Sequence, residues 1–91
     1  MNDCQGRGRV TREGENVATV EYSVQSEPDA VNNFIHGHVE VVEGEKSLST
    51  SDQFTLHMEG NLELDFQVEL ATDQVKGKYQ LKGIGIFRKS P

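Results

Sequence analysis

The chain has 91 residues, of which 34% are hydrophobic and none is tryptophan. This composition is enough for one small hydrophobic core, so we expect residues 1–91 to form a single domain. The formal net charge of −6 argues against a nucleic-acid partner. No apolar run approaches the roughly 20 residues that a membrane-spanning helix needs, so we expect no membrane partner either.

The charged residues are segregated along the chain. Fourteen of the fifteen acidic residues lie within residues 13–73, where Lys46 is the single base. The other eight basic residues lie within residues 1–12 and 74–91. We expect these basic ends either to pair with acidic strands or to lie together as one basic strip.

The only cysteine is Cys4, which excludes an internal disulfide. The first residues, Met1–Gln5, lack the basic start and the apolar stretch of a signal peptide. Both observations favour a cytoplasmic protein. Because Cys4 is close to the end of the chain, we do not expect it to be held in place as a catalytic nucleophile.

Alternation of apolar and polar residues places one set of side chains on one face of a sheet, and it dominates the first half of the chain. It predicts strands at residues 6–12, 17–25 and 34–43. Between the last two, Ser26 can cap a helix and Pro28 is tolerated in a first helical turn. A short helical turn is therefore predicted near residues 26–33.

The alternation is strongest in the second half, where it predicts strands at residues 54–59, 62–70 and 75–82. A four-residue loop over 71–74 would fix the register of the last two strands. It would pair Leu70 with Val75, Phe66 with Tyr79, Leu64 with Leu81, Glu69 with Lys76, and Glu63 with Lys82. This register places apolar pairs on one face and opposite charges on the other.

Six strands that each carry one apolar face must bury those faces against one another. Because the connections are short, the sequence predicts an all-β fold, a six-stranded antiparallel meander that forms a small barrel or half-barrel.

Three histidines are the candidate metal ligands. His36 and His38 point to the polar side of their strand, and they would meet His57 if strand 34–43 paired with strand 54–59. Zinc accepts three such ligands with water in the fourth position. The alternative, which we favour, is that the three histidines share a solvated face, and we then expect no cofactor.

Two isoleucines are the candidate interface residues. Ile84 and Ile86 occupy polar-face positions of the last strand. Either Gly83 or Gly85 forms a bulge that exchanges the two faces, or the isoleucines form an apolar patch for a partner chain.

An apolar ligand would lie between Phe54, Phe66 and Tyr79 inside the barrel. A six-stranded barrel leaves little room for it, since even eight strands enclose only one small ligand.

No catalytic motif is found. The serines within residues 47–51 lie in a loop without a nearby base. The glycine pairs Gly6/Gly8 and Gly83/Gly85 lack the third glycine and the strand-to-helix context of a dinucleotide-binding loop.

The stretches Gly6–Gly8, Val20–Val24, Phe54–His57 and Gly83–Phe87 resemble those of small uncharacterised bacterial all-β proteins of the gene-cassette (orphan) type. The resemblance covers most of the chain, implies a small barrel and supplies no catalytic residue.

We therefore expect a non-enzymatic interaction module that acts as a homo-oligomer, because the core is thin and an oligomer would bury more surface. One alternative is a carrier of a small apolar ligand. Another is a metal-binding protein or metal-dependent enzyme that uses His36, His38 and His57.

Overall fold

The computed structural model describes residues 2–28, 33–45, 47–73 and 75–89, without the side chains of residues 2, 27, 28, 33, 34 and 86. The strands are β1 (Asn2–Arg12), β2 (Glu15–Pro28), β3 (Asn33–Gly44), β4 (Gln53–Met58), β5 (Leu62–Asp73) and β6 (Lys78–Lys89). These residues include no helix long and apolar enough to cross a membrane.

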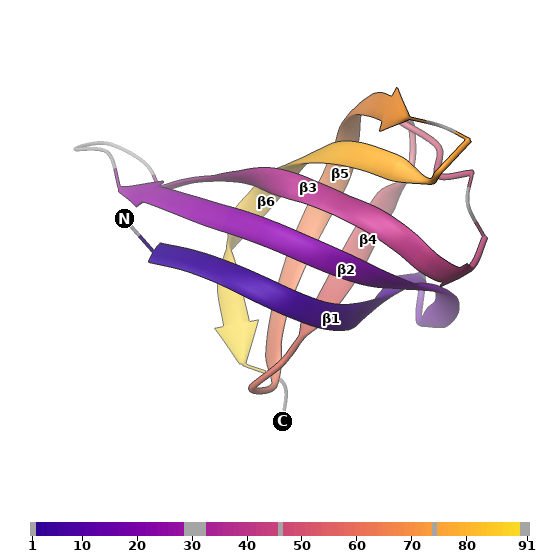
Figure 1. The fold of residues 1–91 in the computed structure, drawn as a ribbon. Coiled ribbons are helices and arrows are strands. Elements are labelled where there is room, and N and C mark those ends of the chain that lie inside the picture. The colour runs from indigo at the N-terminus through magenta and orange to yellow at the C-terminus, as the bar shows by residue number, and fades with distance from the viewer. Residues whose placement is uncertain (1, 29–32, 46, 74, 90–91) are drawn as a thin grey trace.

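All neighbouring strands are antiparallel, and the sheet closes into a barrel in the order β1-β2-β3-β6-β5-β4 (Figure 1). The predicted all-β fold, a barrel of six antiparallel strands, is therefore confirmed. The barrel consists of two consecutive three-stranded meanders, β1-β2-β3 and β4-β5-β6. They join through β3 and β6 on one side and through β1 and β4 on the other.

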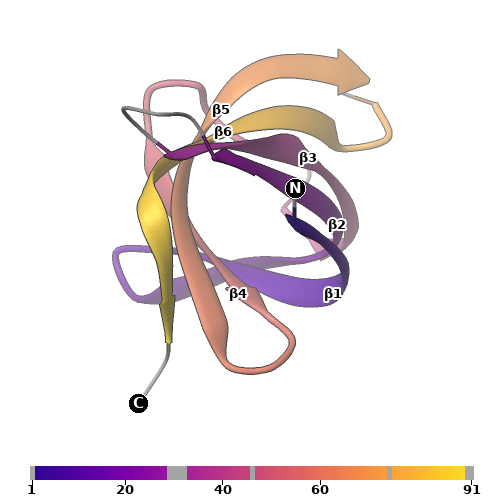
Figure 2. The same cartoon turned by 90° about the vertical axis from the view of Figure 1, so that its left-hand side faces the viewer.

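The core lies inside the ring of strands that is seen end-on in Figure 2. Inward-facing residues of all six strands are buried, as the alternation predicts. The rings of Phe54 and Phe66 stack with their centroids 5.6 Å apart. Leu48, which precedes β4, is also buried, and its backbone N–H donates a hydrogen bond to the Tyr79 hydroxyl at 3.0 Å. The loop before β4 thereby closes over the core.

The helical turn predicted near residues 26–33 is wrong where the structure describes it. β2 continues through Ser26, which pairs with Ile35, and β3 starts at Asn33. The cross-strand partner satisfies the backbone at each step, whereas a single isolated helical turn is costly to nucleate. Residues 29–32 of this prediction lie outside the described residues.

The predicted register of the β5–β6 hairpin is also wrong. β5 runs on to Asp73, so the connection to β6 falls at residues 74–77, and Phe66 pairs with Gly83 instead of Tyr79. At Phe66 the difference is four residues, an even number, so Phe66 and Leu81 still face the core. The charged pairs change as well, since Glu63 lies opposite Arg88 and Lys82 lies opposite Gln67.

Register shifts after Val68 and Ala71 explain why this prediction failed. Each irregularity adds a residue to one strand, which no count of loop residues anticipates. As a result, Leu70 and Val75, predicted to face each other in the core, are 56% and 86% exposed.

Candidate functional site

The barrel closes at a short pairing of β1 with β4, which we call the seam. It consists of Arg9–Thr11 paired with Thr55–His57. Gly8 comes directly before it, and a Cβ atom at this position would collide with the backbone carbonyl of His57. Glycine is therefore required where β1 first approaches β4.

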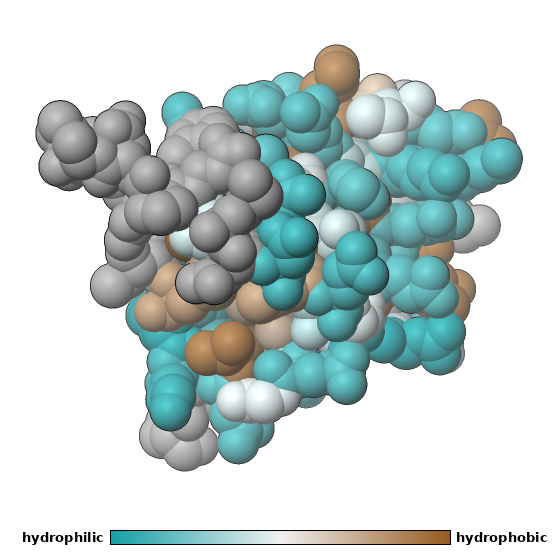
Figure 3. All heavy atoms as spheres, turned by 60° about the vertical axis from the view of Figure 1, so that its left-hand side comes forward, coloured by the Kyte–Doolittle hydropathy of each residue, from teal (hydrophilic) through white to brown (hydrophobic). Residues whose placement is uncertain are grey.

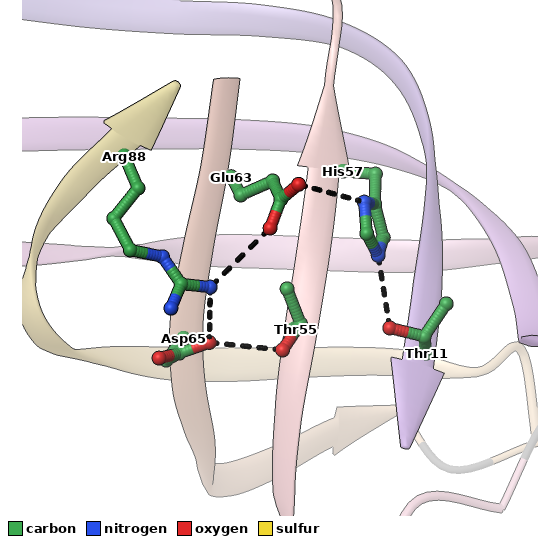
Figure 4. Close-up of polar contacts among 6 residues, drawn as sticks. All are labelled: Thr11, Thr55, His57, Glu63, Asp65 and Arg88. Atoms are coloured by element: carbon green, nitrogen blue, oxygen red, sulfur yellow. Dashed lines mark hydrogen bonds and ion pairs between the residues drawn. The ribbon is translucent and has the colours of Figure 1, made fainter. Parts of the chain in front are cut away.

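Side-chain contacts reinforce the seam. Thr11 Oγ1 lies 2.9 Å from His57 Nε2 (Figure 4). The Arg12 guanidinium donates to Asp52 at 3.3 Å. Both contacts connect β1 to β4 or to the residue before it. They supply polar interactions across a junction with few backbone pairs.

A chain of polar contacts continues from the seam across the outer face of the barrel (Figure 4). The Arg88 guanidinium on β6 donates to Glu63 at 3.3 Å and to Asp65 at 2.9 Å, both on β5. The Thr55 hydroxyl on β4 donates to the same oxygen of Asp65 at 2.9 Å. These contacts tie three strands together, although Arg88 is half exposed and each ion pair of this kind contributes only about 0.2–1 kcal/mol.

The order Thr11, His57 and Glu63 is that of a nucleophile, a base and a carboxylate in hydrolases. The geometry does not support that chemistry. Thr11 is only 9% exposed, and His57 Nδ1 lies 3.8 Å from Glu63 Oε2, which is longer than a hydrogen bond. Glu63 is also shared with Arg88. We therefore interpret this cluster as a structural feature of the closed barrel.

The N-terminal part of β1 has a strand beside it on one side only. Asn2–Gly8 pair with β2, whereas pairing with β4 begins at Arg9. On the other side, Glu59 Oε2 accepts a hydrogen bond from the backbone N–H of Arg7 at 3.3 Å. Asp3 and Gln5 have no strand partner there among the described residues.

The hydrogen bond of Arg7 shows which backbone groups face this side. In an antiparallel strand, the N–H and C=O of successive residues point alternately toward the two neighbouring strands. The N–H of Arg7 points away from β2, and the register of β1 does not shift before Val10. The backbone groups of Asp3, Gln5 and Arg7 therefore form one row, which we call the open edge.

A polar groove of about 530 Å³ lies on the outer face of β2, β3 and β6. The end of β5 and the start of β6 extend beyond the ring of strands (Figure 2). Thr72 and Lys78, from these two segments, line the groove. His36 and His38 line the groove together with Glu40, which lies 3.9 Å from the ammonium group of Lys78. The groove thus presents two imidazoles next to a weak ion pair.

The three histidines of the metal hypothesis are not brought together. β3, which carries His36 and His38, pairs with β2 and β6, whereas His57 lies on β4, which pairs with β1 and β5. The pairing of strand 34–43 with strand 54–59 is therefore wrong. No group of three or more His, Cys, Asp or Glu side chains among the described residues is arranged to hold a metal ion.

The three aromatic residues of the ligand hypothesis are core residues. Phe54, Phe66 and Tyr79 are each at most 1% exposed. The first two stack on each other, and the Tyr79 hydroxyl contacts the backbone of Leu48. A ligand between them would have to displace this packing.

Ile84 lies on the outer face of β6, opposite Asp65, and is 38% exposed. A bulge follows at Gly85, which has a φ of +78°, and the next pairs join β6 to β5 again at Arg88. The bulge leaves Ile84 on the outer face. Ile86 belongs to β6, but its side chain lies outside the described residues, so the interface hypothesis stays a prediction.

Other exposed hydrophobic side chains are scattered. Val42, Leu70 and Val75 are 44%, 56% and 86% exposed. On the face seen in Figure 3, brown hydrophobic residues form a small area bordered by teal hydrophilic ones. Single exposed apolar residues are common on protein surfaces and carry no functional conclusion.

Sequence reasoning missed the open edge and the role of Glu59. The sequence feature that indicates a close neighbour of β1 is the pair Gly6 and Gly8, which occupy inward positions of this strand. A strand face without side chains indicates that another part of the backbone packs closely against it. The sequence does not specify that the neighbouring element is the β4–β5 turn.

Comparison of this chain with protein-family models, with curated proteins and with solved structures found no match.

Proposed function

We propose that the chain is a non-enzymatic interaction module that forms a homodimer through the open edge of β1. The observation that carries this proposal is the row of backbone N–H and C=O groups at Asp3, Gln5 and Arg7, beside which the described part of the chain places no strand. Such an edge is a template to which another strand adds through main-chain hydrogen bonds.

A second copy of the chain is the occupant that the charges of the edge favour. Asp3 and Arg7 carry opposite charges at the two ends of the open edge. An antiparallel copy of the same edge therefore offers a base where the first offers an acid, and the reverse. A different partner would match these charges only if its own edge strand carried a base and an acid at the same spacing.

The interface is short, because β4 occupies the same side of β1 from Arg9 onward. Small interfaces of this type are weak and transient. We expect a dissociation constant in the micromolar range or above, and a rapid exchange between monomer and dimer.

A cytoplasmic location, in a bacterial cell as the sequence resemblance implies, completes the proposal. The single cysteine, Cys4, supports a reducing compartment, because the chain uses no internal disulfide for stability. The acidic net charge keeps copies soluble while the local Asp3–Arg7 complementarity selects the paired arrangement.

Sedimentation velocity of wild-type protein and of two variants at Gln5 tests the proposal. Gln5→Pro removes the N–H that faces the open edge and leaves the hydrogen bonds to β2 intact, because proline is tolerated on an unpaired edge. We expect a concentration-dependent dimer for wild type and for the control Gln5→Ala, and a monomer for Gln5→Pro with an unchanged circular dichroism spectrum. A wild-type monomer up to about 0.5 mM would refute the proposal, since weak specific interfaces form below that concentration.

A second candidate function is supported by the groove, where His36 and His38 lie two residues apart on one face of β3. Two imidazoles in this arrangement can chelate a transition-metal dication whose remaining ligands are water, with affinity in the order Cu²⁺ > Zn²⁺. Titration calorimetry with each metal ion alone tests this. We expect His38→Asn to abolish binding and His57→Asn, a histidine outside the groove, to preserve it. Equal loss in both variants would contradict a site in the groove.

A further inference from the structure

We infer that two copies pair β1 with β1 in one register, centred on Gln5, so that Asp3 of each copy lies opposite Arg7 of the other. This inference rests on the proposed homodimer and specifies its geometry. It follows from the direction of the backbone groups, from the length of the open edge and from the charges of its side chains.

Backbone direction removes half of the conceivable registers. Hydrogen-bonded pairs form only between residues whose N–H and C=O face each other. On the open edge these residues are Asp3, Gln5 and Arg7, since the intervening ones bond to β2. An antiparallel register must therefore pair these three residues among themselves.

The length of the edge selects among the remaining registers. Pairing centred on Gly6 would place Asp3 opposite Arg9, which is already paired with His57. Pairing centred on Cys4 would place Asp3 opposite Gln5, so the carboxylate of Asp3 would not face Arg7. Pairing centred on Gln5 uses all three residues, with the Arg7 N–H exchanging Glu59 for the second copy, and it ends where the pairing with β4 begins.

Charge selects the same register. Arg7 lies on the outer face, where its guanidinium is 3.1 Å from Glu21 and well exposed. In the register centred on Gln5, this guanidinium would lie between Glu21 of its own chain and Asp3 of the second copy. A parallel arrangement would instead align Asp3 with Asp3 and Arg7 with Arg7, which is repulsive.

Disulfide trapping tests the register directly. A residue at the twofold axis meets its own copy in a hydrogen-bonded pair, with Cα atoms about 5.5 Å apart, within the range that a disulfide spans. The variants Gln5→Cys, Asp3→Cys and Arg7→Cys are each prepared in a Cys4→Ser background, which removes the native thiol. Circular dichroism checks that each variant keeps the wild-type fold.

We expect mild oxidation to cross-link Gln5→Cys with itself in nearly full yield. Asp3→Cys and Arg7→Cys should each stay uncross-linked alone, because the two cysteines of such a dimer are offset by four residues along the paired strands. They should form a mixed disulfide when the two variants are combined. The mixed product is specific to this register, because no other antiparallel alignment places these two positions opposite each other.

Two results would overturn the inference and can be told apart from failure of the homodimer itself. Efficient self-cross-linking of Asp3→Cys or Arg7→Cys, or no cross-linking in a protein that sediments as a dimer, would refute the register and leave the dimer in place. No cross-linking together with a monomeric wild type would refute both proposals.

Discussion

The carboxylate of Glu59 accepts a hydrogen bond from the backbone N–H of Arg7, a residue that precedes it by 52 positions. The backbone N–H of Glu59 in turn donates to the Tyr22 hydroxyl at 3.0 Å. Glu59 therefore fixes the β4–β5 turn against β1 and occupies one of the three donors of the open edge. Charged side chains at sheet edges are a common means of limiting unwanted strand pairing.

Replacing Glu59 with alanine is expected to strengthen the homodimer. The N–H of Arg7 then loses its internal acceptor and becomes available to a second strand, while the bond from the backbone of Glu59 to Tyr22 is kept. The twofold dimer has two such sites, and one exposed hydrogen bond at each corresponds to a dissociation constant about 5- to 100-fold lower, measured by sedimentation velocity. Glu69→Ala, an exposed position on β5 with the same change in net charge, is the control. An equal effect in both variants would assign the change to net charge instead.

Removing the contact between Thr11 and His57 is expected to destabilise the barrel. Thr11→Val and His57→Ala should each lower the free energy of unfolding by about 1 kcal/mol, because a part-buried polar atom loses its partner. In a double-mutant cycle the two changes should couple by about 0.5–1.5 kcal/mol. Urea denaturation measures all four proteins, and His38→Ala, on the exposed outer face of β3, serves as the neutral reference. Strict additivity would show that the contact contributes nothing to stability.

Gly8→Ala is expected to destabilise the protein by more than Gly14→Ala. The methyl group at position 8 would meet the carbonyl of His57, so β1 must move away from β4. At position 14 the surrounding space is open, and the cost is limited to about 1 kcal/mol for placing alanine at a φ of +82°. Thermal denaturation compares the two variants. Similar losses would contradict the close approach at the seam.

Two valines distinguish the observed register of β5 and β6 from the one that loop length predicts. Val75 is 86% exposed, so Val75→Asp should change the free energy of unfolding by less than about 0.5 kcal/mol. Val68 is 3% exposed, and Val68→Asp should cost several kcal/mol, because a carboxylate would be buried without a partner. Chemical denaturation of both variants gives the answer, and a large loss in Val75→Asp would favour the register of the simple hairpin.

Alternation in the sequence predicted the strands and their faces well. Phe54, Leu56 and Met58 face the core as expected, and so do Leu64 and Phe66. This succeeded because side-chain direction in a strand follows from local geometry alone. Register failed because the irregularities after Val68 and Ala71, and at Gly85, respond to the curvature of the whole barrel.

The candidate site was predicted less well, because it depends on which strands become neighbours. The three histidines share a polar side in the sequence, yet closure of the barrel through β1 and β4 separates His57 from His36 and His38. Within the described ranges, the same closure leaves Asp3 and Gln5 without a strand on one side. Both relationships depend on the pairing of β1 with β4, which joins residues 44–48 positions apart and which local patterns do not encode.

The organisation of the barrel as two meanders has a consequence for how the protein folds and how it aggregates. Each meander forms from residues close in sequence, whereas the Thr11–His57 contact joins positions 46 residues apart. Closing so long a loop is entropically costly at either junction, but the seam has three paired residues on each strand and the β3–β6 junction has five, so the seam should form last and open first. Once the seam opens, the side of β1 that faces away from β2 is unpaired along the whole strand, and the open edge no longer ends at Arg9. Aggregation on gentle heating should therefore start from this opened, still structured barrel, at a temperature below that of global melting.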